Sequence, residues 1–170
     1  DQAAGLMLDL ARLYWTRLDE SEKAAEHLER LVTAWPDDEG GWELVEELVR
    51  KREGLETLLP LLELRLENQG RFDDLIELLN LKADVVDNDI ERYEVLGRCA
   101  TVRETDLGRP AAAFQYLVRM VSLDSSDPEL IDRLESSGRQ SQELEALLEV
   151  YKGLLGVGES RFEPKEALDS

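Results

Sequence analysis

The chain is poor in the residues that build disulfides, metal centres and catalytic triads. Its 170 residues include one cysteine, Cys99, and one histidine, His27. A single cysteine excludes an internal disulfide and a cysteine metal cluster, and we interpret it as a core thiol on a helix. A lone histidine without converging ligands or a nucleophile is interpreted as a surface residue. We therefore expect no catalytic residue, no metal site and no cofactor.

Residues that favour sheets are also scarce. Aromatic residues make up 6% of the chain, whereas leucine alone supplies 32 positions, so composition favours helices. The apolar content of 42% is enough for a buried core. The three tryptophans, Trp15, Trp35 and Trp42, are interpreted as packing residues. No apolar run approaches the roughly 20 residues that a membrane span needs, so direct membrane insertion is not expected.

Positive charge is in short supply. The chain has 39 acidic and 20 basic residues, which gives a formal net charge of -19. This charge repels nucleic acid and anionic lipid, so we expect no nucleic-acid partner. The basic run Arg50 to Arg52 complements a helix dipole. Because the chain begins with Asp1 and shows no signal sequence, a fragment of a longer protein is expected, with a cytoplasmic location slightly favoured.

Hydrophobic periodicity predicts about nine helices. Their expected ranges are 3–18, 20–35, 42–52, 58–69, 71–86, 90–104, 109–123, 128–134 and 144–155. Gly138 is expected to stop the eighth helix. Residues 156–170 contain two glycines and a proline with few apolar residues, so we expect a frayed tail after a helical domain over 1–155.

Three signals set the expected helix ends. Asp19 and Glu22 have the spacing of a capping box. Pro60 would cost about 3 kcal/mol inside a helix but is tolerated just after a cap at Thr57, which places the start of the fourth helix near Leu58. The acidic turns 37–39, 87–91 and 124–129 lack the central glycine and the twelfth-position acid of an EF-hand, so we interpret them as helix caps.

One helical stretch occurs twice. An offset of 89 residues superposes the stretch that begins at Leu18 on the stretch that begins at Leu107, and it pairs Ala24 with Ala113, Leu28 with Leu117, Leu31 with Met120 and Val32 with Val121. An offset of 86 relates Leu44, Val45 and Leu48 to Leu130, Ile131 and Leu134. Repetition of helical units indicates a solenoid. We therefore predict an all-α solenoid of antiparallel helix pairs.

The repeated stretches resemble the tetratricopeptide repeat, a unit of about 34 residues that folds as two antiparallel helices. The second helix of that family carries small, large apolar, small or apolar, and proline residues at set positions, which fall here on Ala24, Leu28, Leu31 and Pro36. The first-helix positions fall on Leu8, Ala11, Arg12 and Trp15 and, in the second copy, on Tyr93, Leu96, Gly97 and Ala100. Arg12 departs from the family pattern.

The resemblance covers about two thirds of the chain and is weaker over residues 38–87. Nine helices do not divide into pairs. The first can pair with the second, the fourth with the fifth, the sixth with the seventh and the eighth with the ninth, which leaves the third as a spacer. Alternatively the third pairs with the fourth and the fifth is extra.

The resemblance implies a non-catalytic scaffold that binds a peptide or protein on a concave face formed by the first helices. The family's exposed first-helix positions fall on Asp9, Leu13, Thr16, Arg17, Glu94, Arg98 and Thr101. A plain solvated face is the alternative for these positions. Two other functions stay open: an architectural spacer within a longer repeat protein, and an acidic chaperone for a basic partner. An enzyme is less favoured, and the oligomeric state is not predicted.

Overall fold

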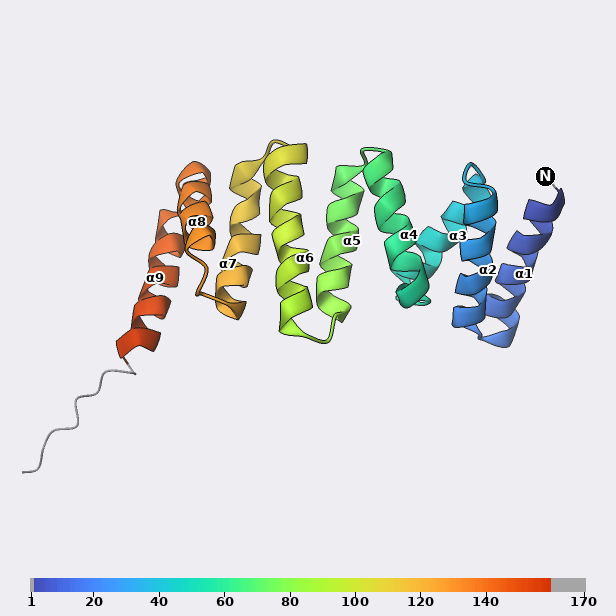
Figure 1. Ribbon diagram of the computed structural model, residues 1–170, viewed down its shortest axis with the longest axis horizontal. Coiled ribbons are helices and arrows are strands. Elements are labelled where there is room, and N and C mark those ends of the chain that lie inside the picture. Colours follow the sequence, from blue (N-terminus) through green and yellow to red (C-terminus); the bar gives the residue numbers. More distant parts are fainter. Residues whose placement is uncertain (1, 160–170) are drawn as a thin grey trace, which may run out of the picture. The chain divides into compact units, whose positions relative to one another are not determined.

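The computed structural model describes residues 2–159, of which 157–159 are described by their backbone alone. Within this range the fold consists of nine α-helices and two short helices of other types, without a strand, which confirms the all-α prediction (Figure 1). The helices are α1 (Gln2–Leu18), α2 (Ser21–Ala34), α3 (Glu39–Arg50), α4 (Leu55–Asn68), α5 (Phe72–Val85), α6 (Asp89–Thr101), the π-helix η1 (Val102–Asp106), the 3₁₀-helix η2 (Pro110–Ala113), α7 (Phe114–Leu123), α8 (Pro128–Ser141) and α9 (Leu144–Glu159).

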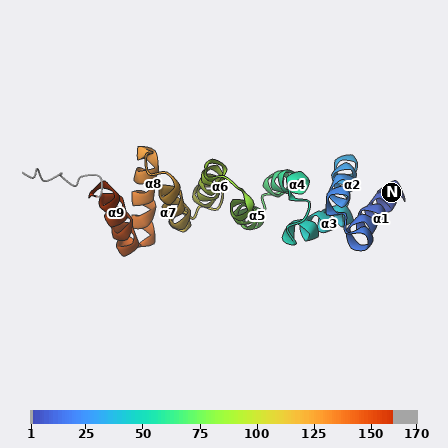
Figure 2. The same ribbon diagram turned by 90° about the horizontal axis from the view of Figure 1, so that it is seen from below.

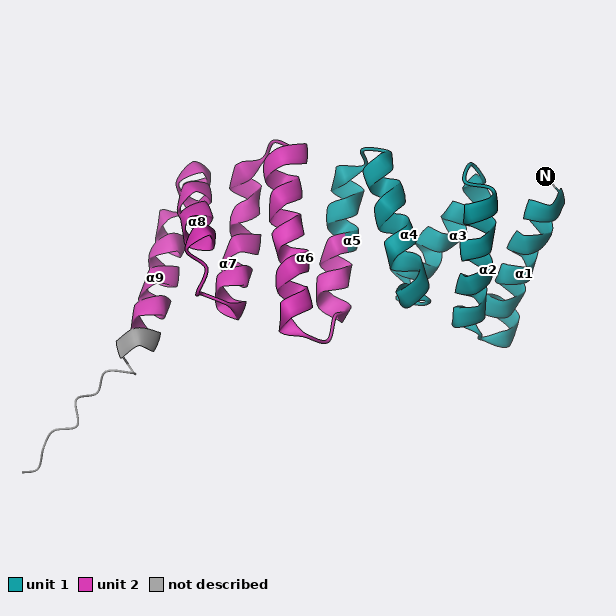
Figure 3. Ribbon diagram, in the orientation of Figure 1, with its two compact units in different colours: residues 1–78 teal, residues 79–170 magenta. Residues whose placement is uncertain are grey.

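The chain divides into two compact units (Figure 3). Unit 1 extends to Leu78 and unit 2 begins at Leu79, so the boundary falls inside α5. No helix of the described chain combines the length and the apolarity needed to cross a bilayer.

In unit 1, α1 and α2 lie side by side and antiparallel (Figures 1 and 2). α2 also packs against α3 and α4, and α3 packs against α4. The third helix is therefore part of the packed unit, which favours the pairing of the third helix with the fourth over the spacer alternative. The core is built from small and branched apolar side chains, which include Ala11, Ala24, Leu28, Leu31, Val45, Leu48 and Leu58.

Unit 2 contains a run of antiparallel helices in which α6 packs against α7, α7 against α8 and α8 against α9 (Figure 1). Its core includes Leu96, Cys99, Ala100, Ala113, Leu117, Leu130 and Leu134. The positions paired by the 89-residue offset are buried in both units: Ala24 and Ala113 are each 0% exposed, and so are Leu28 and Leu117. The repeat seen in the sequence is thus a repeat of core positions.

The acidic turns contain helix caps, as predicted. The side chain of Asp38 accepts a hydrogen bond from the Gly41 amide at 2.7 Å at the start of α3. Asn88 accepts one from the Glu91 amide at 2.8 Å before α6, and Asp127 accepts one before α8. Each side chain satisfies one of the amides that a helix start leaves without an internal partner.

The capping box predicted at Asp19 and Glu22 is wrong. The residue before α2 is Glu20, whose side chain forms no capping hydrogen bond, and Asp19 takes the left-handed backbone conformation with φ 55°. The backbone closes this turn instead, because the Glu20 amide donates to the Tyr14 carbonyl at 2.9 Å.

The predicted cap at Thr57 is also wrong, because α4 begins at Leu55 and carries the exposed Pro60 inside it. Three leucines around the proline are buried, namely Leu58, Leu59 and Leu62. Burying leucine side chains stabilises by about 1.5–3 kcal/mol each, which offsets the loss of one helical hydrogen bond.

Gly54, in front of α4, has φ +60°, and a Cβ atom placed on it would lie 2.7 Å from Cβ of Ala25. This position therefore requires glycine for two reasons: the left-handed conformation and the close approach of α2. The turn into α4 and the packing of α4 on α2 depend on the same residue.

Gly138 does not stop the eighth helix, which continues to Ser141. A Cβ atom on Gly138 would lie 3.0 Å from Cε2 of Phe114, so the glycine makes room for this ring. The ninth helix extends to Glu159, four residues beyond the predicted end of the domain, and residues 160–170 of the predicted tail lie outside the described range.

Candidate functional site

Four of the predicted partner-binding residues lie on α1 in unit 1. Asp9, Leu13, Thr16 and Arg17 are all exposed, and Leu13 keeps 53% of its surface. Steps of four and three residues separate Asp9, Leu13 and Thr16, so these three side chains share one helix face. The Thr16 hydroxyl donates to the Arg12 carbonyl at 2.7 Å and is thereby committed to its own helix.

The other three predicted residues lie on α6 in unit 2. Glu94 and Thr101 are exposed and Arg98 is half-buried. The spacing of these residues repeats that on α1, and the Thr101 hydroxyl likewise donates to the carbonyl four residues earlier, at 3.0 Å from Gly97. The structure therefore places the seven residues on two faces, one in each unit, with the same spacing and the same threonine hydrogen bond.

The two units differ in length between these helices. Residues of α1 correspond to residues of α6 at an offset of 85, whereas residues of α2 correspond to residues of α7 and η2 at an offset of 89. Unit 2 thus carries four additional residues between Thr101 and Ala113, where the π-helix η1 and the 3₁₀-helix η2 lie. In η1 the Leu107 amide donates to the Val102 carbonyl at 3.0 Å, the five-residue step of a π-helix.

An exposed apolar stripe on α1 was not recognised from the sequence. Leu6, Leu10 and Leu13 are 65%, 39% and 53% exposed. They lie four and three residues apart and so share one face with Arg17. The opposite side of α1 buries the small residues Ala4 and Ala11 against unit 1. Periodicity predicted this helix correctly, but it could not reveal that the small residues are the buried ones.

A hollow of about 420 Å³ adjoins the α6 face in unit 2. Glu94 belongs both to this hollow and to the predicted set. Ile90, in the first turn of α6, is 78% exposed, and Tyr93 beside it is half-buried. The lining residues come from the start of α6 and the end of α7: Asp89, Ile90, Tyr93, Glu94, Leu123 and Asp124. We refer to it below as the α6–α7 hollow.

A second hollow, of about 340 Å³, lies in unit 1 next to Trp42. The Arg65 guanidinium stands 4.4 Å from the centre of the Trp42 ring and pairs with Glu39 at 3.0 Å. The indole of Trp42 donates to the Pro36 carbonyl at 2.8 Å, so Arg65 and Trp42 are both engaged within the unit. These contacts join α3 to α4 and explain the buried position of Trp42, as the sequence predicted.

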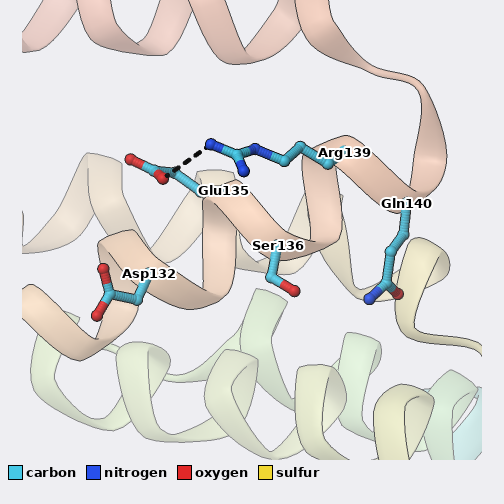
Figure 4. A pocket seen from close by; sticks show the side chains of 5 residues that line it. All are labelled: Asp132, Glu135, Ser136, Arg139 and Gln140. Carbon is cyan, nitrogen blue, oxygen red and sulfur yellow. Dashed lines mark ion pairs between the residues drawn. The ribbon is translucent and has the colours of Figure 1, made fainter.

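A third hollow, of about 380 Å³, follows one side of α8 (Figure 4). Its side chains are Asp132, Glu135, Ser136, Arg139 and Gln140, and Arg139 pairs with Glu135 at 3.6 Å. Glu135 also accepts a hydrogen bond from the Tyr151 hydroxyl. Burial and this carboxylate raise the pKa of Tyr151 to about 12, so the phenol stays protonated. Ser136 forms no side-chain hydrogen bond with Asp132, Glu135 or any other described residue, so the serine is not paired with a base as an activated nucleophile is.

The single cysteine and the single histidine, the side chains most often used in catalysis, are both packed against other residues of their units. Cys99 is fully buried, and burial raises the pKa of its thiol to about 11, against the smaller opposing effect of three arginines. Such a thiol is not a nucleophile at neutral pH. His27 is half-buried and stacks on Tyr14, with ring centres 5.1 Å apart. Among residues 2–159, no three His, Cys, Asp or Glu side chains gather as metal ligands would.

Comparison with known proteins assigns the chain to no family. No protein-family model matches the chain, and no curated protein matches it.

Proposed function

We propose that this chain is a non-catalytic protein-interaction module built from units that resemble tetratricopeptide repeats. The supporting observation is the pair of equivalent faces on α1 and α6. The side chains of Asp9, Arg17 and Glu94 form no hydrogen bond or ion pair with other described residues, and Leu13 is exposed on the same face of α1 as Asp9 and Arg17. Free charges next to an exposed leucine are suited to a protein or peptide partner.

Charge-swap variants test this proposal without altering the net charge. One variant carries Asp9→Arg with Arg17→Glu on α1, and the second carries Glu94→Arg with Arg98→Glu on α6. The control carries Glu29→Arg with Arg30→Glu, an exposed pair on α2 outside both faces. Each variant is used in affinity capture from the source cell extract, and the affinity of each captured protein is then measured with purified components.

We expect at least one captured protein to lose about tenfold or more in affinity for one of the two face variants and to keep its affinity for the control. Circular dichroism establishes that every variant is folded. Capture of no protein, or of proteins indifferent to both face variants, would contradict the proposal and favour an architectural spacer.

A further inference from the structure

The α6–α7 hollow combines exposed apolar surface with unpaired negative charge. Ile90 and Leu123 contribute aliphatic surface, and Tyr93, half-buried on α6, also lines the hollow. Ile90 is the most exposed large apolar residue described, at 78%. A largely exposed β-branched aliphatic side chain near an aromatic residue offers a contact surface for an apolar group of another molecule.

The carboxylates around this surface differ in how far they are neutralised. Asp89 pairs with Arg92 at 2.6 Å, and Arg92 is held away towards α5 by hydrogen bonds to the Ala83 and Val86 carbonyls. Glu94 has no partner among the described residues. Asp124 accepts hydrogen bonds from Ser126 only, which lower its pKa, so it keeps its full charge.

The Tyr93 phenol lies within the electrostatic influence of nearby carboxylates. Its hydroxyl lies 3.5 Å from Oδ2 of Asp127. Burial raises the pKa of Tyr93, and the charges of Asp127 and Asp124 raise it further. Arg133 opposes them, but it is paired with Glu104 at 2.8 Å. The C-terminal end of α7, which closes the hollow at Leu123, adds the negative end of a helix dipole.

We propose that the α6–α7 hollow receives a basic side chain with an apolar neighbour, presented by a peptide segment of the partner. The cation lies against the Tyr93 ring between Glu94 and Asp124, and the apolar neighbour covers Ile90. Arginine suits the site better than lysine because its planar group stacks on a ring while it pairs with carboxylates. The inference rests on the proposed function, since it names the partner chemistry of the α6 face.

The chain has only three isoleucines, so a methyl NMR spectrum labelled at isoleucine can follow the hollow through a single residue. In a methyl NMR spectrum of the full chain labelled at the isoleucine δ1 carbons, Ile90 reports on the hollow. Ile76 is 2% exposed in unit 1 and serves as the internal reference. The probe is a capped hexapeptide of alternating leucine and arginine. Two control peptides replace all arginines by glutamate or all leucines by glycine.

We expect the leucine–arginine peptide to shift the Ile90 methyl signal saturably while the Ile76 signal stays in place. The glycine–arginine peptide binds at least threefold more weakly, and the leucine–glutamate peptide gives no shift. An unmoved Ile90 signal, or equal affinity for the two arginine peptides, would overturn the proposal. A shift of Ile90 with protein concentration alone would assign the hollow to a second copy of the chain.

A pair of variants distinguishes binding at the hollow from the general electrostatic attraction between a chain of net charge -19 and a basic peptide. Glu94→Lys changes the charge at the hollow, and Glu77→Lys makes the same change at an exposed position of α5. Affinity falls about five- to tenfold for Glu94→Lys and less than twofold for Glu77→Lys. Equal losses would overturn the proposal.

The two proposals fail in distinguishable ways. Partner capture that depends on Glu94, with an Ile90 methyl that ignores the peptide, would overturn the inference and leave the proposed function standing. Saturable peptide binding at Ile90, without any captured partner that responds to the charge swaps, would overturn the proposed function and leave the peptide site at the hollow standing.

Discussion

The indole nitrogen of Trp15 on α1 donates a hydrogen bond of 2.7 Å to Oε2 of Glu53, which lies 38 residues later, between α3 and α4. Lys51 lies 4.6 Å from the centre of the same ring. This contact fastens the first helix to the connection that precedes α4, so unit 1 is held together by a polar link in addition to its leucine core.

Replacing Trp15 by phenylalanine tests that link. The Trp15→Phe variant keeps a ring beside Lys51 but leaves the Glu53 carboxylate without its donor, so we expect a loss of about 1–2 kcal/mol in the free energy of unfolding. Urea titration followed by circular dichroism measures it. Glu53→Gln keeps an acceptor for the indole and is the matched control. Equal, negligible losses in both variants would show that the hydrogen bond contributes nothing.

Gly54 and Gly70 offer a matched comparison within unit 1. Both have positive φ, +60° and +66°, but a Cβ atom on Gly70 meets nothing closer than 3.9 Å, whereas one on Gly54 would lie 2.7 Å from Ala25. Gly70→Ala should cost about 1–2 kcal/mol from backbone strain alone. Gly54→Ala should cost at least 1 kcal/mol more, because α2 and α4 must move apart. Chemical denaturation measures both, and equal costs would contradict the packing argument.

Leu28 and Leu117 occupy equivalent positions in the cores of the two units. Substitution of either by alanine should lower the stability of its own unit by about 2–5 kcal/mol. Hydrogen exchange read by mass spectrometry distinguishes the units: Leu28→Ala should increase exchange most in α1 and α2, and Leu117→Ala most in α6 to α8. An increase confined to the wrong unit, or none, would refute the equivalence.

The buried thiol of Cys99 predicts a loss of stability at alkaline pH. The folded state raises its pKa to about 11, whereas the unfolded chain has an ordinary thiol pKa of about 8.5. The folded state therefore binds the proton more tightly. The resulting stabilisation is complete below about pH 8.5 and is lost as the pH rises towards 11.

We expect the stability of the native chain to fall relative to Cys99→Ala by up to about 1.4 kcal/mol per pH unit between pH 9 and 11. Urea titrations of both proteins at matched pH values measure the difference. The variant provides the control, because lysine and tyrosine titration affects both chains alike. A constant difference across this range would show that the thiol titrates normally.

The sequence predicts most of the fold because the positions that are buried also recur. The helix ranges and the caps at Asp38 and Asp127 follow from local sequence patterns, because short-range hydrogen bonds and helical periodicity determine them. Local patterns fail where a distant contact decides the outcome. Gly138 is a helix stop by local pattern, but in the structure it lies inside α8 against Phe114. Pro60 indicates a helix start by local pattern, but it lies inside α4, whose neighbouring leucines are buried.

The candidate surfaces are less predictable than the core. Periodicity places Leu6, Leu10 and Ile90 on helices, but it does not reveal which side of a helix is covered. The α6–α7 hollow depends on Leu123 and Asp124 meeting the start of α6 more than thirty residues earlier. Among the residues of the α6–α7 hollow, only Glu94 was predicted to be exposed, and this prediction came from the resemblance to a repeat family.

The four additional residues near η1 mark the place where the chain tolerates a change of length. Four residues add about 400° of helical rotation, close to one whole turn, and the wide π-turn helps to absorb the remaining 40° or so. The longer connection of unit 2 thus leaves the equivalent core positions on either side, Leu96 before it and Leu117 after it, fully packed.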